Sequence, residues 1–442
     1  RAAVGLRATL DRVAARAPVP VFAVAGVGAQ AQVDELLLQS RLHLVDSPAA
    51  ANVLLVAGSV PAHLTAELAR LHDGLSRPRV NLWWPLGSSV APPMPPAVEV
   101  HDTDPSVLVD AVVDTHRCLL FGEVASSPPA HPDEEPAPWR GIGPYGQGGT
   151  GMTGGVPYGR PMAEVAPDRD GLRLDQLTVR IGPFFARFPT GLVLEVQLQG
   201  DVVQQAHVVV APEGEAAVEV DVPTTFRDAL DTPVPVSVLE LERARSHLRA
   251  IASALAAHQL PSLARRVLRF ASDVHPDQSE DVQRLHRLLR RSQVLGWATT
   301  EVGPISADQL EGTATGPVAR ASGVEQDERT TDPAYLGLGF EPIVHDGGDA
   351  RARMAQRLTE TGQALQLAGR AGDRHHDPES PLESPRGRLA VGDLPAQRLL
   401  PLLPSVLEGM EWGDAVSTVV SLDLDTDEVL SLRSPDRELP VP

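Results

Sequence analysis

The sequence predicts two folded units of different class, joined by a linker. Short apolar runs alternate with helical patterns in residues 1–125, proline and glycine crowd residues 126–172, and a period-two pattern followed by long helical patterns fills residues 173–442. A chain of 442 residues is long enough for two or three domains. The predicted fold is therefore an α/β N-terminal doubly wound layer, then an α+β unit with a small antiparallel sheet and a helical bundle.

The N-terminal layer rests on three apolar runs rich in β-branched residues, each followed by glycine. The runs are residues 19–25, 51–58 and 79–84, with helical patterns at 33–40 and 65–75 between them. Such runs indicate buried parallel strands. Gly26 and Gly28 follow the first run, but the third glycine and the acidic partner of a dinucleotide fingerprint are missing. Ordinary strand-to-helix turns are favoured over a nucleotide site.

Residues 126–172 are predicted to be a linker. The first part, 126–138, is rich in proline and acidic residues and cannot bury enough apolar surface to fold alone. Residues 141–159 hold nine glycines. A phosphate-binding loop would need a preceding strand and a Lys-Ser/Thr ending, so a flexible linker is the preferred interpretation.

The C-terminal unit begins with strand patterns and continues with helices. Period-two alternation at 174–181, 192–198 and 202–210, with a turn at Gly200 and Asp201, predicts antiparallel strands. Helical spacing marks residues 239–270 (perhaps interrupted at Pro261), 281–295, 351–369, 395–407 and 412–422. Residues 316–323 form a turn of small residues around Arg320, which would be a fixed positive charge where helices meet. A simple helix end and connector is the alternative.

Composition excludes several classes of function. The net charge is −20, from 58 acidic and 38 basic residues, which argues against a nucleic-acid binder. There is no run of about 18 apolar residues, so no direct membrane span is expected. The single cysteine, Cys118, permits no intrachain disulfide and no site built from cysteines alone, and it suits a reducing cytoplasm.

The spacing of the histidine and acidic residues does not predict a metal site. His375 and His376 are adjacent and point apart on any regular element, so one metal is hard to share. A calcium loop from Asp423 fails because its sixth position is Glu428 instead of glycine. The group at 101–104 is interpreted as a solvated loop.

Four segments occur in the order found in one family. Residues 180–192, 239–248, 316–323 and 408–423 together resemble the D subunit of NADH:quinone oxidoreductase (respiratory complex I), and similarly the large subunit of energy-converting [NiFe] hydrogenases. This resemblance covers residues 173–430. Residues 1–125 resemble the B subunit of the same enzymes, or the hydrogenase small subunit. The resemblance implies a B-like domain at 1–125 fused through a linker at 126–172 to a D-like domain at 173–442.

The resemblance also assigns positions. Three residues correspond to positions that line the quinone cavity in the family: Phe184, Phe185 and Arg187. The family has histidine at the position of Phe185. Residues matching the structural and coupling pattern are Glu242, Arg243, His247, Arg320, Asp327 and Arg329. Cluster cysteines of the B subunit correspond to Ala29, Gln32 and Ser89, and nickel thiolates of hydrogenases to Asp425 and Glu428. Residues 384–390 resemble a strand that returns to the sheet.

These substitutions decide between functions. A [4Fe–4S] cluster needs about four thiolates, and hard carboxylates do not suit a Ni–Fe site. The resemblance therefore implies a redox-degenerate peripheral-arm subunit that caps or couples to antiporter-like, ion-translocating membrane subunits, on the cytoplasmic face of the membrane, without metal or thiolate-bound cofactors. The alternatives are an active quinone-binding subunit and a soluble scaffold, so whether the chain is an enzyme stays open.

Overall fold

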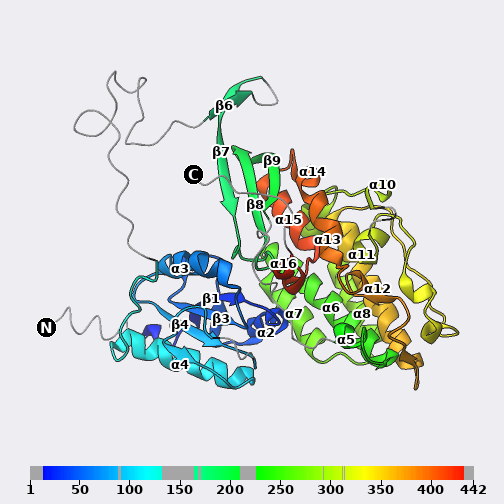
Figure 1. The fold of residues 1–442 in the computed structure, drawn as a ribbon, viewed down its shortest axis with the longest axis horizontal. Coiled ribbons are helices and arrows are strands. Elements are labelled where there is room, and N and C mark those ends of the chain that lie inside the picture. Colours follow the sequence, from blue (N-terminus) through cyan, green and yellow to red (C-terminus); the bar gives the residue numbers. More distant parts are fainter. Residues whose placement is uncertain are drawn as a thin grey trace.

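The N-terminal part of the computed structural model is built on a parallel five-stranded sheet (Figure 1). The strand order is β2-β1-β3-β4-β5 and every neighbouring pair is parallel. The strands are β1 (Val19–Ala25), β2 (Leu42–Leu44), β3 (Val53–Ala57), β4 (Val80–Trp84) and β5 (Val98–Glu99). The chain order reverses between β1 and β3, and at such a point the carboxyl ends of the strands leave a crevice.

The structure describes residues 13–87, 91–131, 164–167, 171–209, 225–291, 293–310, 312 and 314–432. Residues 13–131 are called the N-terminal unit below, and residues 164–432 the C-terminal unit. Most of the expected linker, and Ser89, lie outside the described residues.

Helices cover both faces of the parallel sheet. These are α2 (Gln30–Glu35), α3 (Thr65–Asp73) and α4 (Pro105–Phe121). Val53 and Leu55 of β3 share a core with Leu108 of α4, whereas Leu54 shares the opposite core with Leu68 of α3. Because neighbouring side chains of a strand point to opposite faces, a sheet buried on both sides needs continuous apolar runs, as in the sequence.

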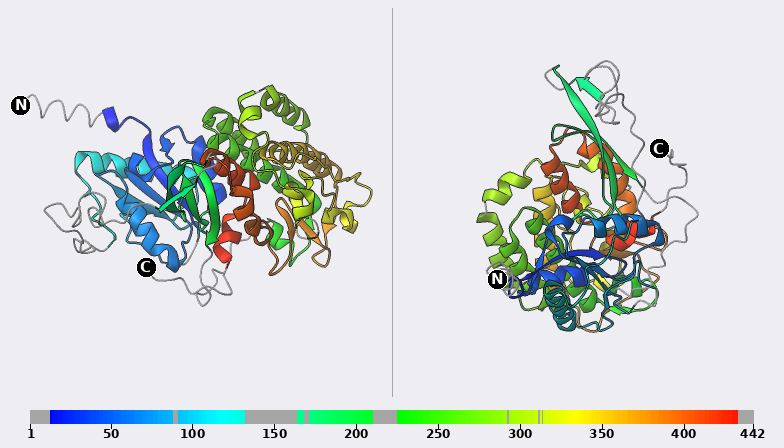
Figure 2. Two further views of the ribbon diagram at one scale, coloured as in Figure 1. Left: turned by 90° about the horizontal axis from the view of Figure 1, so that it is seen from above. Right: turned by 90° about the vertical axis from the view of Figure 1, so that its left-hand side faces the viewer.

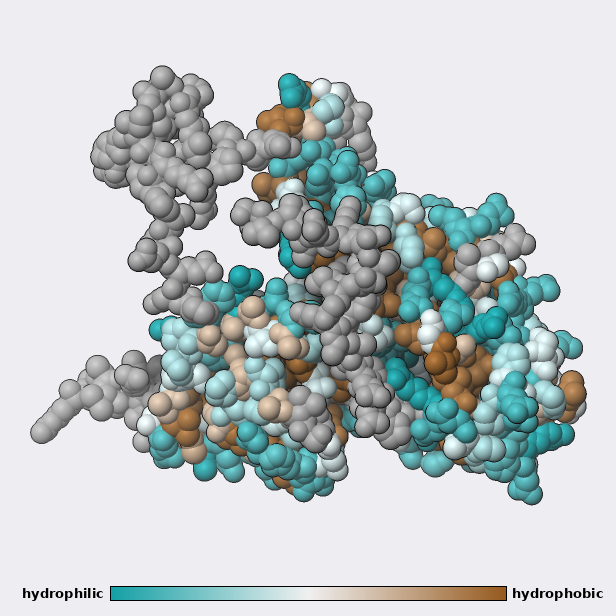
Figure 3. Space-filling model, viewed as in Figure 1, coloured by the Kyte–Doolittle hydropathy of each residue, from teal (hydrophilic) through white to brown (hydrophobic). Residues whose placement is uncertain are grey.

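An antiparallel sheet of order β6-β7-β8-β9 opens the C-terminal unit. Its strands are β6 (Glu164–Pro167), β7 (Arg173–Ile181), β8 (Val193–Gln199) and β9 (Val202–Val209). Val196 and Val203 face the core shared with the C-terminal helices. The outer ends of β6 and β7 project beyond the helices (Figure 2), and hydrophobic surface is visible in that region (Figure 3). Leu172, Leu174 and Leu177 of this part of the chain are exposed.

The helices of the C-terminal unit pack around α6 and α12. The long ones are α6 (Val236–Ala257), α7 (Pro261–Ser272), α8 (Ser279–Arg291), α12 (Ala350–Arg370) and α15 (Trp412–Leu422). The shorter ones are α5 (Thr225–Asp228), α9 (Gln293–Thr299), α10 (Ala307–Leu310), α11 (Gly316–Arg320), α13 (Pro395–Leu399), α14 (Leu403–Leu407) and α16 (Thr426–Ser431). Leu248 and Leu255 of α6 meet Leu358 and Leu365 of α12 in one core. No helix of the described residues is both long and apolar enough to cross a bilayer.

The expectation that residues 384–390 return to the main sheet is wrong. They belong to a separate hairpin of β12 (Leu382–Ser384) and β13 (Gly387–Leu389), whose two-residue turn is Pro385 and Arg386. A second small pair joins β10 (Val234–Pro235) to β11 (His375–His376). Strands of three residues give too short a pattern to assign a partner from sequence.

The two units contact each other through α16 and the loop after β7. Leu430 of α16 lies in the apolar core between the parallel sheet and α3. The backbone N–H of Gly28 donates to Asp427 Oδ1 at 2.8 Å, and Arg187 lies 2.7 Å from Asp46. The C-terminal end of the described chain therefore packs against the N-terminal sheet.

Candidate functional site

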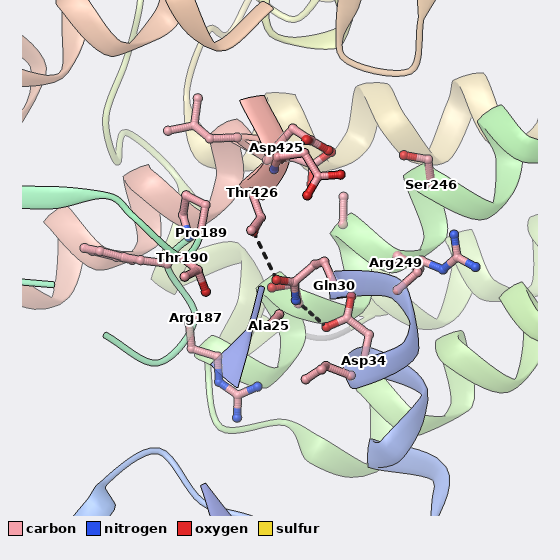
Figure 4. Close-up of a pocket in the computed structure, with 18 of the residues that line it drawn as sticks. Ala25, Gln30, Asp34, Arg187, Pro189, Thr190, Ser246, Arg249, Asp425 and Thr426 are labelled. Atoms are coloured by element: carbon pink, nitrogen blue, oxygen red, sulfur yellow. Dashed lines mark hydrogen bonds between the residues drawn. The ribbon is translucent and has the colours of Figure 1, made fainter. Parts of the chain in front are cut away.

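A cavity of about 530 Å³ lies between the two units. The N-terminal unit contributes β1, α2 and the end of β2, and the C-terminal unit contributes residues 184–190, the inner face of α6, the β12–β13 turn and residues 423–428. Figure 4 shows Gln30 and Asp34 reaching from α2 toward Thr426, with Arg187 and Arg249 nearby. The hydroxyl of Thr426 donates to Gln30 Oε1 at 3.1 Å, and Gln30 Nε2 donates to Asp34 Oδ1 at 2.9 Å. The volume falls in the range of small-molecule sites.

Aromatic rings supply much of the apolar wall. Five of the eight phenylalanines of the chain line the cavity: Phe22, Phe184, Phe185, Phe188 and Phe226. The ring of Phe185 lies 4.8 Å from that of Phe188 and 5.9 Å from Trp412. Phe185 is 37% exposed, so part of its ring stays open to a ligand. Phe184, Phe185 and Arg187 thus line this cavity, and quinone binding there stays a prediction.

Two more arginines on the cavity wall, besides Arg187, are paired with carboxylates. Arg386 at the hairpin turn lies 2.9 Å from Asp425, and its Nε donates to the carbonyl of Asp423 at 2.8 Å. Arg249 donates to Glu242 at 3.1 Å. Both arginines therefore have an acidic partner and are less available to an anionic ligand.

Three other carboxyl groups on the wall have no salt bridge to an arginine among the described residues. These are Asp34 of α2 and Asp427 and Glu428 of α16. They accept hydrogen bonds from neutral donors instead: Gln30 to Asp34, Gly28 to Asp427, and the backbone N–H of Ala396 to Glu428 Oε2 at 2.8 Å. The cavity wall consequently carries carboxyl groups that have no arginine within salt-bridge distance among the described residues.

Burial controls the ionisation of these carboxyl groups. Desolvation raises the pKa of Asp34 to about 6, against the opposing effect of Arg249. Desolvation, with the neighbouring Asp425, raises the pKa of Asp427 to about 6 and that of Glu428 to about 8. Removing a carboxylate from water disfavours its charged form. Near neutral pH, Glu428 therefore holds a proton.

We expect Glu428→Gln to change the pH dependence of stability. The folded pKa is raised, so Glu428 contributes stability that is full below its unfolded pKa and lost as pH rises through about 8. The glutamine variant keeps the neutral shape, so at about pH 9 it should be more stable than the wild type by on the order of 1 to 3 kcal/mol. Urea denaturation at about pH 5 and 9 measures this difference.

The control for this prediction is Glu195→Gln, at an exposed position of β8. Its difference from the wild type should be the same at both pH values. An equal effect of Glu428→Gln at both pH values would contradict the raised pKa of Glu428.

A buried arginine–carboxylate network adjoins the cavity behind the hairpin. Its members are Arg243, Arg320, Arg329, Glu240, Asp327, Glu360 and Glu383, all at most 3% exposed. Arg320 lies at the end of α11 and is fully buried. It lies 2.7 Å from Asp327, 2.7 Å from Glu360 and 2.8 Å from Glu383. Arg320 is thus the group that joins three carboxylates from different elements.

The network contains one more carboxylate than it has arginines, and its pKa values reflect this. Burial alone would raise the pKa of Asp327, but Arg320 and Arg329 outweigh it and lower the pKa to about 2. For Glu383, burial and the charge of Asp327 outweigh Arg320 and raise the pKa to about 7. Glu383 is the carboxyl group that takes up a proton most readily.

The other residues that the resemblance assigns to the coupling pattern differ in their surroundings. Arg243 donates to the carbonyls of Glu383 and Ser384 at 2.6 and 2.9 Å, so it holds the hairpin onto α6. His247 is fully buried 3.1 Å from Glu360, and burial lowers its pKa. Glu242 faces the cavity.

Three charged residues of the coupling pattern do not lie on the surface of the chain. The side chains of Arg320, Asp327 and Arg329 lie in the interior, at 0%, 2% and 3% exposure. Asp327 instead accepts two hydrogen bonds from the guanidinium of Arg329 and one from its backbone N–H, and the guanidinium lies 4.2 Å from the centre of the Phe340 ring. They therefore fix the packing of helices and cannot themselves contact another protein chain.

The described positions that the resemblance matches to metal ligands lie at the cavity or beside it. Gln32 lines the cavity and Ala29 is fully buried at the start of α2. Asp425 caps α16 by accepting from the N–H groups of Asp427 and Glu428. Among the described residues, no group of three His, Cys, Asp or Glu side chains has the geometry of a metal site.

Sequence reasoning missed four residues that shape this region: Asp34, Glu360, Glu383 and Arg386. Asp34 and Glu360 occupy helices with no unusual spacing. Arg386 follows a proline in a charged segment, which is typical of an ordinary turn. Of the four, only Arg386 had a usable sequence signal: the segment Ser384-Pro385-Arg386-Gly387 indicates a tight turn, although not that the turn borders a cavity.

Comparison with known protein families matches a part of the chain that holds five of the seven members of this network. Residues 260–392 match the family described as respiratory-chain NADH dehydrogenase, 49 kDa subunit. A D subunit of the NADH-quinone oxidoreductase of Salinispora arenicola is 37% identical over 93 residues, which are 20% of this chain and 24% of that protein. The D subunit of the same enzyme from Desulfotalea psychrophila is 30% identical over 150 residues, 26% of this chain and 40% of the relative.

Part of this chain is therefore similar to the D subunit of NADH-quinone oxidoreductase, and that expected resemblance is confirmed. The chain aligns with only 24% to 40% of the length of these relatives. The resemblance of residues 1–125 to the B subunit stays a prediction.

Proposed function

We propose that the chain is a peripheral component of a complex-I-like assembly that has lost its own electron-transfer ligands and acts through shape and charge. The observation that carries this proposal is the match of residues 260–392 to the 49 kDa subunit family, in a chain with one cysteine. One thiolate cannot supply the four that a [4Fe–4S] cluster requires. Cys118 lies on α4 and does not line the cavity.

The proposed architecture is a B-like unit fused to a D-like unit. Support comes from the parallel sheet of residues 13–131 and from its contact with α16, where Leu430 enters the core beside α3. In this proposal the fused pair caps antiporter-like membrane subunits on the cytoplasmic face of the membrane. The buried arginine–carboxylate network would keep the D-like helices in a fixed arrangement, as a transmitting scaffold requires.

The experiment is affinity purification of the tagged chain from mildly solubilised native membranes, with mass spectrometry and a visible spectrum of the eluate. We expect antiporter-like membrane subunits to be recovered, with no iron bound to this chain once it is separated from them. An untagged strain provides the control. Recovery without any membrane partner would contradict the proposal and favour a soluble scaffold.

An active quinone-binding subunit is the second candidate. The observation that favours it is the 530 Å³ cavity with five phenylalanines on its wall. Phe185, however, has no group that can hydrogen-bond or protonate a quinone oxygen. The test of this candidate is quinone reduction by the purified assembly. Loss of that activity when the cavity beside Phe185 is narrowed, for example by Ala186→Trp, would favour this candidate over the redox-degenerate component.

A further inference from the structure

We propose that the cavity between the two units binds an organic cation, a protonated amine that carries an apolar or aromatic body. The site is formed by Asp34, Asp427 and Glu428 together with the phenylalanine wall. The proposed binding is a property of the chain by itself, so it goes beyond the proposed assembly into a larger complex.

The first argument is the charge balance of the wall. Four arginines line the wall, and three of them, Arg187, Arg249 and Arg386, are each paired with a carboxylate of the same region. The charge of the fourth, Arg227, acts to lower the pKa values of Asp427 and Glu428 but does not outweigh their burial. Asp34, Asp427 and Glu428 are not paired with arginine among the described residues. A ligand that brings a positive charge would therefore give these carboxyl groups a cationic partner, whereas an anion would be repelled by each of them that is ionised.

The second argument is an oxygen without a partner on a buried side chain. Glu428 is 6% exposed and lines the cavity. Its Oε2 accepts from Ala396, but no described protein group donates to its Oε1. Because Glu428 lines the cavity, this oxygen can accept a hydrogen bond from a donor on a ligand. An ammonium group offers three donors and no acceptor.

The third argument concerns the body of the ligand. Phe184, Phe185 and Phe188 lie on the loop that follows β7 and face the same space. Apolar rings beside carboxyl groups suit a ligand with one charged end and one apolar end, and ring faces also attract ammonium groups. Inorganic cations would leave this apolar wall unused.

The proposal has a consequence for proton uptake. The groups that face Asp427 and Glu428 are Asp425, Arg386 and Arg227. Those that face Asp34 include Arg249, Arg187 and Asp423. A bound ammonium favours the ionised carboxylates, so binding below about pH 8 must release protons, and affinity must fall as the pH is lowered.

The test is calorimetric titration of the full-length purified chain with 4-phenylbutylamine and its neutral analogue 4-phenylbutanol. We expect the amine to bind at least about tenfold more tightly than the alcohol. Titration in two buffers with different ionisation heats should show proton release. The triple variant Asp34→Asn, Asp427→Asn, Glu428→Gln should weaken amine binding about tenfold or more and leave the alcohol unchanged.

Controls separate this effect from a loss of folding. Glu195→Gln, on an exposed site of β8, should bind like the wild type. Asp34→Asn alone preserves an acceptor for Gln30 and provides a milder variant if the triple variant does not fold. Equal binding of amine and alcohol, an unchanged triple variant, or no amine binding at millimolar concentration would each overturn the proposal. A short-chain quinone that binds where the amine does not would overturn it too, in favour of the quinone candidate.

Because the titration needs no partner, its outcome is independent of the membrane purification. A chain that binds the amine and recovers no membrane subunits would keep the cavity proposal and refute the proposed function. A chain that recovers membrane subunits but does not bind the amine would keep the proposed function and refute the cavity proposal.

Discussion

Replacing Arg320 with methionine should destabilise the chain by about 3 to 5 kcal/mol, or prevent it from folding. The methionine fills a similar volume but leaves the carboxylates of Asp327, Glu360 and Glu383 without the guanidinium that contacts all three. An unpaired carboxylate in the interior is costly because it has lost its water without gaining a partner. The midpoint of urea denaturation measures the loss.

Arg284→Met is the matched control. Arg284 of α8 also pairs with two carboxylates, Glu280 and Asp281, but its side chain is 60% exposed. Exposed ion pairs contribute about 0 to 1 kcal/mol, so this variant should change the midpoint little. Similar losses for the two variants would contradict a special role of the buried network.

A double variant tests the reason for the loss. Glu383 is the network carboxyl group with the pKa raised to about 7, so it is the member that is most easily replaced by a neutral group. Arg320→Met combined with Glu383→Gln should therefore lose less stability than Arg320→Met alone. A double variant that is less stable than the single one would indicate that packing, and not charge, holds Arg320 in place.

The local elements of the fold could be predicted because their signals lie within one segment. The run at 19–25 is β1 and the pattern at 351–369 lies within α12. The interruption expected at Pro261 is real, since α6 ends at Ala257 and α7 begins at Pro261. Strand length, helical spacing and proline position need no knowledge of distant residues.

The candidate site could be predicted only in part because its residues meet across the whole chain. Gly28 and Asp427 are 399 positions apart, and Arg320 and Glu383 are 63 apart. No local pattern reports such contacts. The resemblance named Arg320 and Asp327 but not Glu360 and Glu383, which also compensate the charge of Arg320 in the interior. Motif residues can thus be recognised without their neighbours being known.

The two glycines that bound residues 316–323 offer the sharpest remaining test of this region. Both have positive φ, +83° at Gly316 and +96° at Gly323. A Cβ added at Gly316 would lie 2.3 Å from the carbonyl oxygen of Arg386, whereas one at Gly323 would meet nothing within 4 Å. Backbone atoms cannot move aside as a flexible side chain does. The α11 segment and the β12–β13 hairpin therefore approach each other as closely as glycine permits.

Gly323→Ala should cost about 1 kcal/mol, which is the strain of a left-handed conformation for alanine. Gly316→Ala adds the clash with Arg386 and should cost about 3 kcal/mol or more, measured by urea denaturation of both variants. The clash would also push Arg386 away from Asp425, so Gly316→Ala should alter the cavity while Gly323→Ala should not. Equal losses would mean that the hairpin can retreat from α11. In that case the buried network would not hold the two elements rigidly, and the cavity wall would be free to move with the hairpin.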